Sequence, residues 1–186
     1  MKKILGIMGS PRRNGNTHIL VTSILKGAKE KGAKVDILFL NDLDINECKG
    51  CHICWEEKQC CIDDDMNDIY PKIIESDAII FGTPVYWYGP TALMKGFIDR
   101  FVYFNCPKNR VKIKDKQAVL AIPFEEKTAK TSELLVVFFE KCFKYLQMNL
   151  VSKIIVPGVG NKGEILKKKD YLNKAYELGR TLANNN

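Results

Sequence analysis

Short runs of apolar residues alternate along the chain with longer segments in which apolar residues recur at helical spacing. The short runs contain almost no polar positions, which is typical of strands buried on both faces of a sheet. The pattern predicts five strands, over residues 4–8, 35–40, 78–81, 118–122 and 154–156. It predicts helices between and after them, over residues 17–31, 66–75, 92–104, 132–147 and 163–183.

Strands that alternate with helices predict an α/β fold with a parallel sheet covered on both faces. Crossover connections are right-handed almost without exception, so we expect a three-layer, doubly wound sandwich. For five strands we expect the order 2-1-3-4-5. Residues 1–186 contain no repeat, linker or low-complexity segment, so one domain is expected. Ligands of such sheets bind beyond the carboxyl ends of the strands, which directs attention to the loops after Met8, Leu40 and Phe81.

Charge and composition narrow the possible functions. The chain has 29 basic and 22 acidic residues, but they are interspersed, and the one dense basic run, at residues 167–169, lies in a predicted helix. This pattern indicates a solvated helix face rather than a nucleic-acid patch. No run approaches the roughly 20 apolar residues that span a bilayer, and no signal peptide is evident, so a cytoplasmic location without membrane contact is expected. The seven cysteines are then expected as thiols or ligands rather than disulfides.

The loop after the first strand, residues 9–17, is rich in glycine, hydroxyl and amide groups. Free N–H groups at a helix start attract anions, and an arginine can add a charge-assisted hydrogen bond. The loop lacks both G-x-G-x-x-G and Gly-Lys-Ser/Thr, which argues against a dinucleotide or triphosphate. A polar turn with Asn16 or Thr17 as a helix cap is the simpler alternative. We predict a site for a terminal phosphate, formed by Ser10, Arg12, Asn14, Asn16 and Thr17.

The loop after Phe81 carries three adjacent aromatic residues. A flat ring needs aromatic or apolar walls and a few backbone donors. Three neighbouring aromatic side chains cannot all point into a core, so at least one should face a ligand or a partner subunit. The predicted ring-binding residues are Pro84, Val85, Tyr86, Trp87 and Tyr88.

Four cysteines follow the second strand with the spacing Cys48-x2-Cys51-x2-Cys54-x5-Cys60, and Cys61 comes next. Such compact spacing suits a cubane cluster, whereas zinc usually prefers two separated pairs. Free thiols along a flexible loop, or a redox pair, remain open alternatives, and Cys61 could replace Cys60 in either case. The acidic run at residues 63–65 is interpreted as the start of the helix at Met66, rather than as a metal site.

Three segments together resemble the flavodoxin-like NAD(P)H-dependent FMN reductases: Gly-Ser-Pro-Arg-x-x-Gly-Asn-Thr at 9–17, Thr-Pro-Val-Tyr-Trp at 83–87 and Lys-x-Phe-x-Asp-Arg at 95–100. The cysteine spacing is similar to that of the iron–sulfur flavoproteins among them. The resemblance implies FMN, with its phosphate bound by Ser10, Arg12, Asn16 and Thr17, and a 4Fe–4S cluster on Cys48, Cys51, Cys54 and Cys60. Relatives often have glycines in the loop at 123–128, which this chain lacks, so no contact is assigned there. Asp99 and Arg100 are interpreted as structural, an ion pair near a subunit contact.

The implied function is an FMN-dependent oxidoreductase that takes hydride from NAD(P)H and passes electrons to a flavin, a quinone or another acceptor. The flavin carries this chemistry, so no side chain is assigned as catalytic. The resemblance also implies a homodimer or a larger homo-oligomer. Two alternatives are an electron-transfer protein without NAD(P)H activity, like a flavodoxin, and a redox or metal sensor based on the cysteines.

Overall fold

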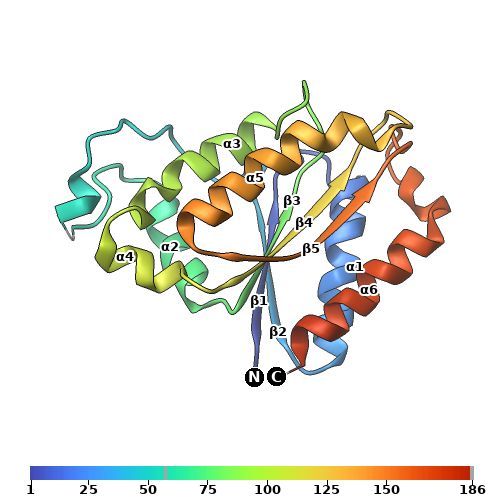
Figure 1. The fold of residues 1–186 in the computed structure, drawn as a ribbon, viewed down its shortest axis with the longest axis horizontal. Helices are drawn as coiled ribbons and strands as arrows, with labels where there is room; N and C mark the ends of the chain where they lie inside the picture. The colour runs from blue at the N-terminus through green and yellow to red at the C-terminus, as the bar shows by residue number, and fades with distance from the viewer. Residues whose placement is uncertain (57, 185–186) are drawn as a thin grey trace.

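In a computed structural model of the chain, which describes residues 1–56 and 58–184, one sheet of five parallel strands lies between two layers of helices (Figure 1). The strand order is β2-β1-β3-β4-β5, so the predicted order is confirmed. The strands are β1 (Lys3–Met8), β2 (Lys34–Phe39), β3 (Ala78–Gly82), β4 (Gln117–Pro123) and β5 (Asn149–Val156). Strands β1 and β3 are neighbours, and the chain leaves them for opposite faces of the sheet, so the switch point lies between them.

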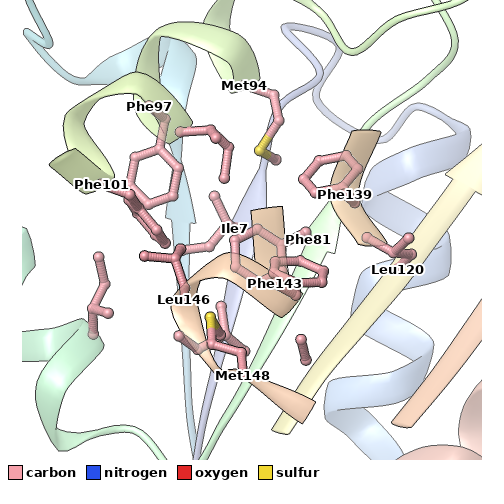
Figure 2. Close-up of a cluster of buried hydrophobic side chains, with 14 of the residues drawn as sticks. Ile7, Phe81, Met94, Phe97, Phe101, Leu120, Phe139, Phe143, Leu146 and Met148 are labelled. Atoms are coloured by element: carbon pink, nitrogen blue, oxygen red, sulfur yellow. The ribbon is translucent and has the colours of Figure 1, made fainter. Parts of the chain in front are cut away.

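The two helical layers bury separate cores. Helices α1 (Asn16–Glu30) and α6 (Lys169–Ala183) cover one face, while α2 (Met66–Glu75), α3 (Ala92–Asp99) and α5 (Glu133–Leu146) cover the other (Figure 1). The core under α3 and α5 is rich in aromatic side chains (Figure 2). In it, the Phe81 ring of β3 lies 4.9 Å from the Phe143 ring and 5.9 Å from the Phe139 ring, measured between centroids. The central strand is therefore fixed directly by α5.

Helices α1 and α6 approach one another closely through two glycines. A Cβ atom at Gly179 would lie 1.8 Å from the carbonyl oxygen of Ile24, and one at Gly27 would lie 1.9 Å from that of Tyr176. No side chain fits in either place, so glycine is required by backbone contact. This contact holds α1, whose first turn forms part of the site described below.

The structure corrects several predicted boundaries. The expected helix at 92–104 is α3 followed by a 3-10 turn (Arg100–Phe104), and the one at 163–183 is a 3-10 turn (Glu164–Lys167) followed by α6. Strand β5 begins at Asn149, five residues before the predicted start. Helix α4 (Pro107–Ile113) was not predicted, because its seven residues carry few apolar positions.

Across residues 1–56 and 58–184, no helix is both long enough and apolar enough to cross a bilayer.

Candidate functional site

Three loops meet at the carboxyl ends of the central strands. The Gly9 N–H donates to the carbonyl of Gly82 (2.8 Å), and the Thr83 N–H donates to that of Ala121 (3.1 Å). The buried Thr91 hydroxyl donates to the Gly9 carbonyl and caps α3 by accepting from the Met94 N–H. These bonds hold the loops after β1, β3 and β4 side by side.

The loops enclose a cleft of about 150 Å³. Most of the predicted cofactor residues line it: Ser10, Arg12, Asn16, Thr17, Pro84, Val85 and Tyr86. The cleft is also lined by residues that sequence reasoning missed: Pro123, Phe124, Glu125, Glu126, Val159 and Gly160. The phosphate loop and the aromatic loop therefore share one cavity, although 66 residues separate Thr17 from Thr83 in the chain.

The start of α1 faces this cleft without a protein cap. Gly15 is the residue before the helix, and no side chain caps the first turn, which corrects the alternative of an Asn16 or Thr17 cap. Within the described residues, the N–H groups of Asn16, Thr17 and His18 have no hydrogen-bond acceptor. Thr17 is only 2% exposed, and it lines the cleft. A buried helix start with free donors requires water or a ligand, and its dipole favours an anion.

The two neighbouring side chains of the loop add one hydroxyl and one positive charge. Ser10 is 6% exposed, and its hydroxyl oxygen accepts from the Arg12 N–H (3.3 Å), which leaves its proton free to donate. The Arg12 guanidinium reaches across the cleft to the carbonyl of Gly160 (3.3 Å). Arg13, by contrast, points away and pairs with Asp42.

The Asn16 side chain bridges the loop after β1 and the loop after β5. Its amide nitrogen donates to the carbonyls of Val159 (3.0 Å) and Asn161 (2.9 Å), and its amide oxygen accepts from the Ile165 N–H (3.1 Å). Both N–H donors of this side chain are thus used to hold the loop after β5. Only its backbone N–H remains for a ligand.

Asn14 lies outside the cleft. Its backbone is in the left-handed region (φ 57°), and its N–H donates to Nδ1 of His18 (2.9 Å). The two residues border a separate surface hollow on the outer side of α1. The structure thus places Asn14 as a turn residue, away from the other predicted phosphate contacts.

The aromatic loop forms a tight two-residue turn. Tyr86 and Gly89 exchange backbone hydrogen bonds (2.9 and 3.0 Å), and Trp87 and Tyr88 between them both have positive φ, 50° and 63°. Such turns favour Asn-Gly, because side chains are strained in the left-handed region. Trp87 is nevertheless 95% exposed. Two bulky aromatic residues are thus held in strained, exposed positions.

Trp87 and Tyr88 line a second hollow, of about 260 Å³, that adjoins the first. Val85 and Glu126 border both. The predicted ring-binding residues are therefore divided between two neighbouring spaces: Pro84 and Tyr86 line the cleft, Trp87 and Tyr88 line the outer hollow, and Val85 borders both.

The cysteine loop lies on the other side of α3 and is held by a buried arginine. Arg100 is 1% exposed and forms two hydrogen bonds to the Asp64 carboxylate, one of 3.1 Å. It also donates to the carbonyl of Asn46 (2.9 Å) and to Sγ of Cys60 (3.3 Å). Burial opposes the charge of both partners, yet their mutual hydrogen bonds raise the pKa of Arg100 and lower that of Asp64.

This geometry corrects the interpretation of Asp99 and Arg100 as an ion pair. Asp99 instead pairs with Lys95, one turn earlier in α3 (2.7 Å). Within the acidic run, the Asp64 carboxylate accepts from the Met66 N–H (3.1 Å) at the start of α2. Asp65, the residue directly before the helix, provides no side-chain cap, so the expected role at the helix start is carried by Asp64 alone. Arg100 therefore joins the start of α2 to the cysteine loop.

The five thiols of this loop differ in exposure. Cys54 is buried, Cys48 and Cys60 are half-buried, and Cys51 and Cys61 are exposed. Burial, with the nearby thiol of Cys60, raises the pKa of Cys54 to about 11. The Sγ atoms of Cys51 and Cys61 lie 3.3 Å apart.

The donor types suit an iron–sulfur cluster, but the arrangement is not that of a preformed metal site. In the part of the chain that the structure describes, no three Cys, His or acidic side chains converge at metal-binding geometry. Cys51, a predicted ligand, has Cys61 as its sulfur neighbour instead.

Comparison with known proteins gives the family. The model of the NADPH-dependent FMN reductase family matches residues 2–156. The chain belongs to this family. The predicted resemblance is thus confirmed, and the phosphate loop, the aromatic turn and the cysteine loop all lie within the matched region of this FMN reductase family member.

Individual relatives extend the comparison. An iron–sulfur flavoprotein of Methanocaldococcus jannaschii is 44% identical over 98 residues, which are 53% of this chain and 51% of that protein. The chain thus aligns with about half the length of this and similarly named curated relatives. YwqN of Bacillus subtilis, whose name describes an NAD(P)H-dependent FMN-containing oxidoreductase, is 27% identical to this chain. The match covers 95% of this chain and 96% of YwqN. Among solved structures, an NAD(P)H:quinone oxidoreductase from Methanothermobacter marburgensis has the same fold, with a TM-score of 0.75 at 18% identity. The superposition covers 99% of this chain and 96% of that protein.

Proposed function

We propose that this chain binds FMN in the cleft and uses NAD(P)H to reduce a small acceptor such as a flavin or a quinone. The observation that carries the proposal is the buried, uncapped start of α1 beside the aromatic turn. An anion at a helix start and a flat ring against aromatic walls are the two ends of one FMN molecule. When bound, FMN supplies hydride and electron transfer between the nicotinamide and the acceptor.

The chain's own groups would hold the phosphate. The free N–H groups at residues 16–18 and the hydroxyls of Ser10 and Thr17 would donate to its oxygens. Arg12 would add a positive charge at the edge, where it now bonds only to a carbonyl. Asn16 would contribute indirectly, because its three hydrogen bonds fix the opposite wall of the cleft.

The ring would lie toward the aromatic turn. Pro84, Val85 and Tyr86 would border it, and the adjoining hollow at Trp87 and Tyr88 would receive the nicotinamide or the acceptor ring. Because Glu126 borders both spaces, its carboxylate would disfavour negatively charged acceptors there. We assign no acid or base, because hydride transfer through the flavin needs none from the protein.

A 4Fe–4S cluster on Cys48, Cys51, Cys54 and Cys60 is part of this proposal, supported by the compact spacing and by the names of two relatives, both described as iron–sulfur flavoproteins. Cluster binding would require Cys51 to move from Cys61 toward the other thiols. Anaerobic iron and acid-labile sulfide analysis tests this part separately: about four irons per chain support it, and none after reconstitution contradicts it.

We also propose a homodimer or larger homo-oligomer, because Trp87 is 95% exposed and would be covered in such an assembly. Light scattering of the purified protein tests this. A monomer at micromolar concentration would contradict it.

The deciding experiment is FMN titration followed by anaerobic NADH or NADPH. Flavin binding followed by bleaching supports the reductase. Binding without bleaching supports the alternative of an electron-transfer protein, and no binding leaves the cysteine-based sensor as the better account.

A further inference from the structure

Two exposed thiols of the cysteine loop lie in contact. Sγ of Cys51 and Sγ of Cys61 are 3.3 Å apart, and both residues are exposed. A disulfide bond needs about 2.05 Å between the sulfurs, so closure requires a shift of little more than an ångström.

The surroundings distinguish this pair from the other thiols. Cys54 is 8% exposed, which limits access to its sulfur. The Cys60 sulfur is held by the Arg100 guanidinium (3.3 Å), and that guanidinium is itself fixed by Asp64. Although Cys60 and Cys61 are adjacent in the chain, only Cys61 is turned to solvent beside Cys51. The Arg100 contact therefore holds the Cys60 thiol in place, whereas the Cys61 thiol is exposed beside Cys51.

We infer that Cys51 and Cys61 form a redox-active dithiol that reacts with small disulfides, a site separate from the flavin cleft. One thiolate of the pair attacks a sulfur of the substrate disulfide, which breaks the S–S bond and releases one thiol. The second thiolate attacks the resulting mixed disulfide and releases the other thiol. Two cysteine thiols are oxidised, one small disulfide is reduced to two thiols, and the two protons leave on those products.

A disulfide between Cys51 and Cys61 would compete with cluster binding in the cysteine loop. Cys51 is one of the four predicted cluster ligands, whereas Cys61 is the additional cysteine outside the set. A disulfide between them removes one ligand, so the oxidised dithiol and a cluster on Cys48, Cys51, Cys54 and Cys60 exclude each other.

Peptide mapping tests the pairing directly. The full chain is reduced, desalted into buffer with a chelator so that no metal holds the thiols, exposed to oxidised glutathione, and alkylated. Trypsin cleaves after Lys49, Lys58 and Lys72, so Cys51 and Cys54 fall in residues 50–58 and Cys60 and Cys61 in residues 59–72. Non-reducing mass spectrometry then detects the two peptides joined through one disulfide.

The matched variants Cys60→Ser and Cys61→Ser identify which cysteine of residues 59–72 takes part, and fragmentation of the joined peptides distinguishes Cys51 from Cys54 in residues 50–58. We expect the joined peptides in the unmodified chain and in Cys60→Ser, and at least a tenfold loss in Cys61→Ser. Joined peptides that persist in Cys61→Ser, or their absence from the oxidised unmodified chain, would overturn the inference. FMN titration of Cys61→Ser keeps this result separate from the proposed function: we expect unchanged flavin affinity, because Cys61 borders neither hollow of the cleft.

Discussion

Replacing Thr17 by valine removes one hydroxyl from the start of α1 while keeping the shape of the side chain. Thr17 is 2% exposed and lines the cleft, and valine keeps its branched shape, so the packing around the side chain is preserved. The free energy of unfolding of the apoprotein should change by less than about 1 kcal/mol. A hydrogen bond to a charged group contributes about 1.5–3 kcal/mol, so the loss of one to the phosphate should weaken FMN binding about 10- to 150-fold.

The assay is quenching of flavin fluorescence when apoprotein is titrated into FMN, repeated with riboflavin, which lacks the phosphate. Thr17→Val should lower the affinity for FMN and leave that for riboflavin unchanged. Thr22→Val is the matched control, because Thr22 lies on the same helix but is exposed outside the cleft. Unchanged FMN affinity in Thr17→Val, or an equal loss for both flavins, would refute the placement of the phosphate.

Two further predictions concern stability. Gly179→Ala should lower the free energy of unfolding, measured by urea titration, by about 1–3 kcal/mol or more, because its methyl group would lie 1.8 Å from the carbonyl oxygen of Ile24. The control is Gly96→Ala in α3, whose methyl group would meet nothing within 4 Å and which should be neutral or stabilising. Equal effects of the two substitutions would contradict the contact between α1 and α6. Arg100→Met should cost about 3–5 kcal/mol, because it leaves the Asp64 carboxylate buried without its partner. Although burial alone would raise it, the hydrogen bond from Arg100 lowers the pKa of Asp64 in the folded state. The stabilisation is therefore present above the unfolded pKa, near 3.9, and is lost as the pH falls below it, which acid titration of stability should show in the parent and not in Asp64→Asn.

The fold could be predicted because the strands are near-continuous apolar runs that end abruptly. Ile79, Ile80 and Phe81 are fully buried, and Gly82, Thr83 and Pro84 end the apolar run at once. Helix α4 could not be found in this way, because Lys108, Arg110 and Lys112 alternate with its few apolar positions.

The site was predicted where local sequence specifies it and missed where distant segments meet. The phosphate loop carries its own signal, since helix start, hydroxyls and arginine lie within nine residues. The role of Asn16 depends on carbonyls 143 and 145 residues away, which no local pattern contains. Val159 and Gly160 were missed for the same reason, although their place after the fifth strand could have directed attention to them. The ion-pair partner of Arg100 is Asp64, 36 residues earlier in the chain, whereas the local sequence pointed to the adjacent Asp99.

Titration of the apoprotein with FMN, followed by anaerobic addition of NADH or NADPH, tests the central claim most directly. We expect one FMN bound per chain, with the visible flavin absorbance lost when the nicotinamide is added and restored by an acceptor. Protein that takes up no FMN would contradict the assignment of the cleft.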